Sequence, residues 1–273
     1  MYRRKLGHEL SLAQPQIGNA ARSKLSIVGM WNLPPLELTL SKSDVHVWRA
    51  NLDQPAGLIQ QLAEILSADE VRRAERFYFE QDRVRFIVGR GLLRTILSRY
   101  LGIAANQLQF CYSSRGKPDL VQKLGGDRLR FNLSHSQGLV LYAVTRDRAI
   151  GIDVEHIRPI AEADQIVKSF FSDYEKTVYH NLPPHQKQAA FFNCWTRKEA
   201  FIKAIGEGLS LPLDQFNVSL TPGEPARLLK IKGDKASNQW SIQELTFDDN
   251  YASALVVEGN DWNLSCWEWQ EKG

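Results

Sequence analysis

Several short segments either alternate apolar and polar residues or form brief apolar runs, as expected for strands that border a core. Five segments show this pattern: 44–50 (DVHVWRA), 130–134 (RFNLS), 139–145 (LVLYAVT), 149–155 (AIGIDVE) and 251–259 (YASALVVEG). Two longer segments instead carry apolar residues at helical spacing: Leu92, Leu93, Ile96, Leu97 and Leu101 in one, Phe191, Trp195, Ala200, Phe201 and Ile205 in the other. The pattern predicts a mixed α+β protein in which these apolar residues form the core.

The two helical segments belong to a faint internal repeat with an offset of about 105 residues. LSADEVRRAERF aligns with FSDYEKTVYHNL, and GRGLLRTILSRYLGIAANQLQF aligns with WTRKEAFIKAIGEGLSLPLDQF. Each half begins with a strand, passes through helices and reaches a further strand after a turn that contains glycine. We therefore predict two similar α+β halves, 43–147 and 148–273, after an N-terminal arm at 1–42, with a ligand cleft between the halves.

Two acids lie within one predicted strand, in the sequence AIGIDVEH. Successive strand residues face opposite sides, so Asp153 and Glu155 share one face while Ile152 and Val154 share the other. Neighbouring carboxylates stay ionised together only when a cation, a cluster of donors or water compensates them. An exposed strand face is the commoner origin of such a pair, and the residues alone leave all three possibilities open.

A second motif, WTRKEAFIKAIGEG, predicts a helix that a pair of glycines ends. Glu199 and Lys203 are four residues apart on it, which is the spacing of a surface ion pair worth about 0.2 to 0.5 kcal/mol. Alternatively, Glu199 joins Asp153 and Glu155 as an oxygen ligand, and Lys203 reaches an anion. Three carboxylates without Cys or His favour a hard cation such as Mg²⁺, shared with substrate phosphates.

A third motif, SSRGKPDL, predicts a turn shaped by Gly116 that presents Arg115 and Lys117, two donors suited to phosphate. Polar side chains follow where one strand is predicted to turn into the next: Asn132, Ser134, His135 and Ser136. Turn residues with free donors can hold a phosphate. Taken singly, a solvated cation and a histidine bonded within its own loop are the commoner explanations of Lys117 and His135.

Arginine is frequent between residues 72 and 99: Arg72, Arg73, Arg76, Arg83, Arg85, Arg90, Arg94 and Arg99. Spacings of seven and four residues are near whole helical turns, so Arg83, Arg90 and Arg94 fit one helix face. Arginines of this kind usually solvate a helix. Aromatic residues are not interleaved with them as on a nucleic-acid-binding surface, so the pattern does not predict nucleic-acid binding.

Charge and cysteine content narrow the class of protein. The net charge of +3 comes from residues 1–29, whose five bases and one acid leave the remaining chain at −1, so there is no general support for nucleic-acid binding. Cys111, Cys194 and Cys266 are too widely spaced for a disulfide framework or a CxxC metal site. No apolar run reaches membrane-spanning length. We therefore expect a cytoplasmic protein with no membrane partner.

Taken together, RGKPDL, FNLSHS, GIDVE and FFNCWTRKEAFIKAIGEGLSLPLDQF, in this order, resemble the surfactin-type 4′-phosphopantetheinyl transferases. These enzymes prime carrier proteins of fatty-acid, polyketide and nonribosomal peptide synthesis. The resemblance covers roughly residues 44 to 260, including FYFEQDRVRFIVGR, and leaves out the N-terminal arm. It implies a monomer of two pseudo-symmetric halves, each a small, largely antiparallel sheet packed on helices, with coenzyme A bound between them.

The resemblance also implies roles for the candidate residues. Asp153, Glu155 and Glu199 would hold Mg²⁺, or alternatively Mn²⁺, together with the pyrophosphate of coenzyme A, and Lys203 would bind the phosphates. The catalytic residues would be Asp153, Glu199 and Lys203. The 3′-phosphoadenosine end would be bound by the remaining candidates: Arg115, Gly116, Lys117, Asn132, Ser134 and His135, with Arg73 or Arg85 adding positive charge.

The implied reaction is transfer of 4′-phosphopantetheine from coenzyme A to a serine of an apo acyl, polyketide or peptidyl carrier protein, with release of 3′,5′-ADP. The same residues would also suit a Mg²⁺-dependent nucleotide pyrophosphohydrolase or a non-catalytic coenzyme A-binding module. One departure from the family is visible: Glu70 stands near the start of a predicted helix where the family often has a basic residue. This makes the phosphate contacts of the first half a weaker inference than the metal site.

Overall fold

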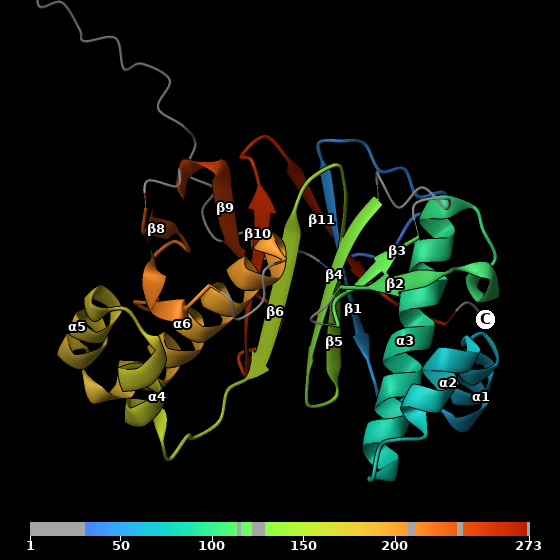
Figure 1. The fold of residues 1–273 in the computed structure, drawn as a ribbon, viewed down its shortest axis with the longest axis horizontal. Coiled ribbons are helices and arrows are strands. Elements are labelled where there is room, and N and C mark those ends of the chain that lie inside the picture. The colour runs from blue at the N-terminus through green and yellow to red at the C-terminus, as the bar shows by residue number, and fades with distance from the viewer. Residues whose placement is uncertain (1–30, 114–115, 122–128, 207–210, 234–236, 272–273) are drawn as a thin grey trace, which may run out of the picture.

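Two groups of helices enclose a central region of strands in the computed structural model (Figure 1). The structure describes residues 31–113, 116–121, 129–206, 211–233 and 237–271. Helices α1, α2 and α3 lie at one end of the molecule, and α4, α5 and α6 lie at the other. The predicted mixed α+β fold is confirmed.

The same order of elements occurs twice. The first half contains β1 (Asp44–Asn51), α1 (Ala56–Glu64), α2 (Ala68–Ala74), α3 (Glu80–Leu101), η1 (Ala105–Gln107), β2 (Phe110–Tyr112), β3 (Pro118–Leu120), β4 (Leu129–Ser136) and β5 (Leu139–Arg146). The second contains β6 (Ile150–His156), α4 (Ala163–Phe170), α5 (Asp173–Asn181), α6 (Pro184–Ile205), η4 (Leu213–Gln215), β7 (Phe216–Val218), β8 (Leu228–Ile231), η5 (Ser237–Gln239), β9 (Trp240–Glu244) and β10 (Tyr251–Glu258). The long helices α3 and α6 both have 22 residues. No helix in the described ranges is long and apolar enough to cross a membrane.

The strands form two main sheets that repeat one topology. One has the order β11-β1-β5-β4 and the other β6-β10-β9, while β2-β3 and β7-β8 are small two-stranded sheets. β1 and β4 pair antiparallel with β5, as β6 and β9 do with β10. β11 (Asn263–Glu268) has no counterpart, and it pairs parallel with β1. The last strand of the chain thus lies in the sheet of the first half, although the sequence assigns it to the second.

Three apolar cores follow from the alternation along the strands. In β1, Trp48 and Ala50 pack toward α3, whereas Val45 and Val47 pack toward the other sheet. The core between the sheets also contains Ile150, Ile152 and Val154 of β6. A third core lies between α6 and the second sheet. The sheets therefore pack face to face, and each has its helices on its outer face.

A buried ion pair repeats between the halves. α2 and α5 both begin with a capping box, and in each the box glutamate bonds a cation of the long helix: Glu70 Oε2 accepts from Arg94 Nε at 2.7 Å, and Glu175 Oε2 lies 2.8 Å from Lys198 Nζ. The four side chains are almost fully buried. Each cation also donates to two backbone carbonyls after its helix, at residues 105 and 108 for Arg94 and at 213 and 216 for Lys198. The pair therefore fixes α2 or α5 and the next segment to the long helix.

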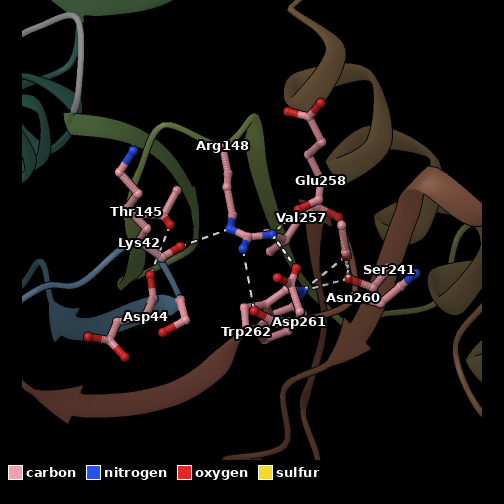
Figure 2. A network of polar contacts seen from close by, with 12 residues as sticks. Lys42, Asp44, Thr145, Arg148, Ser241, Val257, Glu258, Asn260, Asp261 and Trp262 are labelled. Carbon is pink, nitrogen blue, oxygen red and sulfur yellow. Dashed lines mark hydrogen bonds and ion pairs between the residues drawn. The ribbon is translucent and has the colours of Figure 1, made fainter. Parts of the chain in front are cut away.

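Arg148, in the connection from β5 to β6, joins three distant segments (Figure 2). Its Nε donates to the carbonyl of Lys42 at 2.9 Å, and its Nη1 donates to the carbonyl of Glu258 at 3.1 Å and to Asp261 Oδ1 at 2.9 Å. The start of β1, the β5–β6 connection and the end of β10 are thereby held together, next to the boundary predicted at residues 147 and 148.

The segment before β1 is also attached to the fold. Asn32 N donates to the carbonyl of Cys266 at 3.1 Å, and Glu268 N donates to the carbonyl of Asn32 at 2.8 Å. Trp31 packs edge-on against Phe247. The segment 31–42, which the sequence assigns to the arm, therefore contacts β11 through Asn32, and its later carbonyls at Pro35 and Leu40 accept from Arg99 and Arg146. Residues 1–30 lie outside the described ranges.

Candidate functional site

One cleft of about 1020 Å³ lies between the two halves, and its walls come from α2, α3, β3, β4, β6 and α6. The predicted site residues among the described ones all line it: Arg73, Arg85, Gly116, Lys117, Asn132, Ser134, His135, Asp153, Glu155, Glu199 and Lys203. Arg115 lies outside the described residues. The tertiary structure thus brings together side chains that are up to 130 positions apart in the sequence.

The close approach of α6 to β6 positions the acidic part of the cleft. Gly151 in β6 makes this approach possible, because a Cβ at this position would lie 2.0 Å from the carbonyl oxygen of Ala200 and 2.4 Å from the backbone nitrogen of Ala204. The opposite face of β6 packs into the core between the sheets. β6 therefore carries its acids on the side of α6, where Glu199 and Lys203 lie in the turns beside Ala200 and Ala204.

Side chains of β4, rather than backbone hydrogen bonds, connect the two sheets beside the cleft. Asn132 Oδ1 accepts from Ile152 N at 2.9 Å, Ser134 Oγ donates to Asp153 Oδ1 at 2.8 Å, and Ser136 Oγ donates to Glu155 Oε2 at 3.1 Å. The predicted strand 130–134 is confirmed, but the turn was placed too early: β4 continues through Ser136, and the turn follows at residues 137 and 138. Alternate strand residues face one side, so the side chains of Asn132, Ser134 and Ser136 all reach β6.

In this structure Asp153 is compensated by Lys203. Lys203 Nζ lies 2.7 Å from Asp153 Oδ1 and 2.9 Å from Ser134 Oγ. Asp153 is buried, and its second oxygen, Oδ2, has no hydrogen-bond partner. Lys203 therefore forms its ion pair with Asp153 of β6, whereas the helical spacing in the sequence suggested a surface pair with Glu199.

Glu155 and Glu199 lie close enough to Asp153 for their charges to interact. Burial raises the pKa of Glu155 above its usual range, and the negative charge of Asp153 raises it further. The pKa of Glu199 is raised by the same two causes in the same order. No group of three or more His, Cys, Asp or Glu side chains in the described part of the chain is arranged to hold a metal ion. The acids form a repulsive cluster that a further positive charge would stabilise.

Basic groups line the other end of the cleft. Lys117 Nζ donates to the backbone carbonyl of Lys203 at 2.5 Å, so it connects the β2–β3 turn to α6. Arg85 pairs with Asp53 at 3.3 Å, and Arg73 lies over the ring of Phe86. The pKa of His135 is lowered, first by desolvation in the cleft and then by the charges of Lys203 and Arg85. His135 is therefore a neutral side chain near neutral pH.

Two residues at this end were misjudged from sequence. Arg90 and Arg94 were expected to solvate α3, but both are buried beside Glu70. Of the three arginines proposed for one helix face, only Arg83 is solvated, where it pairs with Glu80. The repeat aligned from sequence places Arg94 on Ala200, and only the offset of 104 between the two helices in the structure places it on Lys198, so nothing in the sequence indicated the buried pair.

The cleft can therefore bind an elongated anion with several charged groups. One end offers a lysine among three carboxylates, which suits a phosphate together with a divalent cation. The other offers arginines and aromatic rings, which suit a second anionic group beside a planar ring.

Comparison with known proteins agrees with this geometry. Residues 149–256 match the family model of the 4′-phosphopantetheinyl transferase superfamily, and residues 48–146 match that of the N-terminal part of a 4′-phosphopantetheinyl transferase. The 4′-phosphopantetheinyl transferase HetI of Nostoc sp. is 45% identical over 88% of this chain and 98% of its own. The enzymes of Bacillus pumilus and Bacillus subtilis, psf-1 and Sfp, are 37% and 35% identical over 62% and 59% of this chain and 70% and 69% of theirs. The chain belongs to the 4′-phosphopantetheinyl transferase superfamily, in agreement with the resemblance to its surfactin-type members.

Proposed function

We propose that this chain transfers the 4′-phosphopantetheine group of coenzyme A to a serine of an apo carrier protein of the acyl, polyketide or peptidyl type, with Mg²⁺ bound, and releases 3′,5′-ADP. Membership of the transferase superfamily supports the reaction class. The proposed partners are coenzyme A and the carrier protein. We also propose that the enzyme acts as a monomer in the cytoplasm.

The observation that carries the proposal is the state of Asp153. Its carboxylate is buried at the cleft, with Oδ1 paired to Lys203 and Oδ2 without a partner. An unsatisfied buried carboxylate oxygen costs free energy unless a ligand or ion meets it. A site that binds a phosphate together with a cation would meet this oxygen and leave Lys203 to the phosphate.

The donor set fits a hard divalent cation. Asp153, Glu155 and Glu199 offer only oxygen atoms, and their mutual repulsion, seen in the raised pKa values of the two glutamates, is relieved by positive charge. We propose these three residues as the ligands of Mg²⁺, with Mn²⁺ as an alternative. When bound, the ion supplies neutralisation of the charge on the pyrophosphate.

The remaining candidates would bind and orient coenzyme A. Lys203 moves from Asp153 to the pyrophosphate, where its ammonium stabilises the negative charge that grows on the leaving group. At the other end, Arg73, Arg85, Lys117 and His135 are the proposed contacts of the 3′-phosphoadenosine part, with Arg115 and Gly116 in the same role. Asn132 and Ser134, which the sequence also assigned to this part, bond β6 and so position the acidic part instead. His135 is proposed to contribute a ring N–H as a hydrogen-bond donor.

In the reaction, a bond forms between the serine oxygen of the carrier and the phosphorus that bears pantetheine, and the bond from that phosphorus to the bridging oxygen breaks. The serine proton leaves as the bond forms. Glu199 is the proposed acceptor of this proton, directly or through a water. Positioning and charge neutralisation contribute most of the rate, as in other phosphoryl transfers.

The test is incubation of the protein with coenzyme A, MgCl₂ and an apo carrier protein, followed by mass spectrometry of the carrier and chromatography of nucleotides. Transfer adds phosphopantetheine to the carrier and releases an equal amount of 3′,5′-ADP. Release of 3′,5′-ADP without modification of the carrier would identify a pyrophosphohydrolase instead. Binding of coenzyme A without either product would identify a non-catalytic module.

A further inference from the structure

Arg90 of α3 lies in the wall of the cleft, and its polar contacts are incomplete. Its side chain is 7% exposed, and its one ion pair in the described structure joins Nε to Glu70 Oε1 at 3.5 Å. Its Nη1 is buried and makes no hydrogen bond. A guanidinium has five N–H donors, and buried donors in native structures are almost always satisfied.

The second half of the molecule compensates the equivalent glutamate with a single cation. There, Glu175 is satisfied by one cation, Lys198, and by the backbone nitrogens of Ser172 and Val218. In the first half, Arg94 fills the role of Lys198. Glu70 Oε1, unlike Glu175 Oε1, has no hydrogen-bond partner in the described structure and faces Arg90 Nε at 3.5 Å, so Arg90 adds a second positive charge beside Glu70.

The residue at the equivalent position of α6 is Cys194, since an offset of 104 relates the two long helices and places Arg94 on Lys198. Cys194 is fully buried and uncharged in ordinary conditions, because burial raises its pKa well above the usual range. A charged residue here is thus found only in the half where the position borders the cleft.

The surroundings of Arg90 suit a ligand with a phosphate group and a planar ring. The guanidinium lies over the rings of Phe86, Phe110 and Tyr112, at 5.2 to 5.9 Å from their centroids. With Arg94 it places two positive charges against the single charge of Glu70. Arg73 borders the same wall and also a smaller cavity beside it, which Tyr112 and Gly116 line. This end of the cleft is therefore positively charged and partly aromatic.

We propose that Arg90 binds the 3′-phosphate of coenzyme A and makes the enzyme selective for coenzyme A over its 3′-dephospho form; the inference rests on the function proposed above. The planar guanidinium can donate two parallel hydrogen bonds to a phosphate monoester. Nη1 then gains the acceptor that the structure lacks. Arg90 is a binding residue, and it takes no part in the chemical step.

The experiment compares two ligands that differ only in the 3′-phosphate, adenosine 3′,5′-bisphosphate and adenosine 5′-monophosphate, by isothermal titration calorimetry of the full chain. The wild type should bind the bisphosphate more tightly. Arg90→Gln should lower the affinity for the bisphosphate by roughly 10- to 100-fold, as expected for lost charge-assisted hydrogen bonds. The affinity for the monophosphate should stay within about 2-fold of the wild-type value. Arg83→Gln is the matched control on the same helix, because Arg83 pairs with a carboxylate in solvent, and it should change neither ligand.

An equal weakening of both ligands in Arg90→Gln would show a purely structural role and overturn the proposal, as would a wild type that does not distinguish them. If Arg90→Gln does not fold, Arg90→Lys decides: it keeps the charge but loses the paired donors, so an unchanged ratio of the two affinities overturns the proposal. A wild type that transfers phosphopantetheine but shows no effect of Arg90 would leave the proposed function intact and reject only this inference.

Discussion

At the scale of single residues, Lys203 connects the acidic and the phosphate-binding parts of the site. Its side chain is 28% exposed and bonds Asp153 and Ser134. Its backbone carbonyl accepts a hydrogen bond from the ammonium group of Lys117. Its position differs from that of a lysine in an exposed helical pair, whose contribution to stability is about 0 to 1 kcal/mol. A compact ammonium held between a buried carboxylate and open cleft can move to a bound phosphate.

We predict that Lys203→Ala and Lys203→Arg are folded but lower kcat by about 100-fold or more, which is the usual effect of removing a donor that stabilises transition-state charge. The arginine variant fails because a planar guanidinium does not fit the place of an ammonium beside Asp153. Steady-state transfer to an apo carrier protein measures the effect, and circular dichroism checks the fold. Lys187→Ala, on the same helix, is the control; near-normal turnover in both Lys203 variants would return this residue to an ordinary ion-pairing role.

A second prediction at this scale concerns the metal. Because Mg²⁺ would bind the folded protein and relieve repulsion among three carboxylates, it should raise the thermal midpoint of the wild type, and EDTA should reverse the shift. Asp153→Asn should remove this shift and nearly abolish transfer, and Glu199→Gln should do the same. Glu155→Gln should be the mildest, since a water can replace one ligand. A Mg²⁺ shift of wild-type size in Asp153→Asn would exclude Asp153 as a ligand.

At the scale of elements, the site depends on how closely α6 packs on β6. This distance is set by Gly151, since any Cβ there meets backbone atoms of α6, which cannot move as a flexible side chain would. The same packing brings Glu199 and Lys203 of the helix to Asp153 and Glu155 of the strand. The GIDVE motif thus combines one residue that sets a distance with two that carry charge.

We therefore predict that Gly151→Ala lowers the free energy of unfolding by about 1 to 3 kcal/mol, the usual cost of overpacking, and lowers transfer more than that loss of folded protein explains. Urea unfolding and transfer kinetics measure the two effects. Gly57→Ala in α1 is the control, because a Cβ there meets nothing within 4 Å, so its stability should be unchanged or slightly higher. Equal stability of both variants would show that α6 can move away from β6 at little cost.

At the scale of the whole molecule, the cleft lies between two similar halves that contribute different side chains to it. β4, an edge strand of one sheet, reaches β6, an edge strand of the other, through Asn132, Ser134 and Ser136. β11 pairs with β1, so the last strand of the chain connects the second half to the sheet of the first half. Asn32 bonds β11 through its backbone and so adds to this attachment.

We predict that a chain starting at Met30 folds and keeps its transfer activity, because it retains Trp31 and Asn32, whose contacts attach the described N-terminal segment to the fold. A chain starting at Ser43 should be less stable, since it loses those contacts and the buried Leu40. Thermal unfolding and transfer assays at ordinary salt compare the two. Loss of folding or activity in the Met30 chain would mean that residues 1–29 are part of the functional protein.

The sequence by itself determined the local features. Alternation and helical spacing predicted the strands and helices, the repeat predicted the two halves, and D-x-E in a strand predicted that Asp153 and Glu155 share a face. The motifs together identified the family. These features depend on residues close in the chain, whose periodicity fixes which side of an element is apolar.

The tertiary structure decided which distant partner each residue meets. Nothing local indicates that β11 joins the first sheet, that β4 bonds β6 through its side chains, or that Lys203 pairs with Asp153 and not with Glu199. The burial of Arg90 and Arg94 was missed for the same reason: an arginine on a helix has the same local pattern whether it meets water or a buried glutamate. Strand pairing and charge compensation depend on which surfaces the packed fold brings together, and periodicity along one segment does not contain that information.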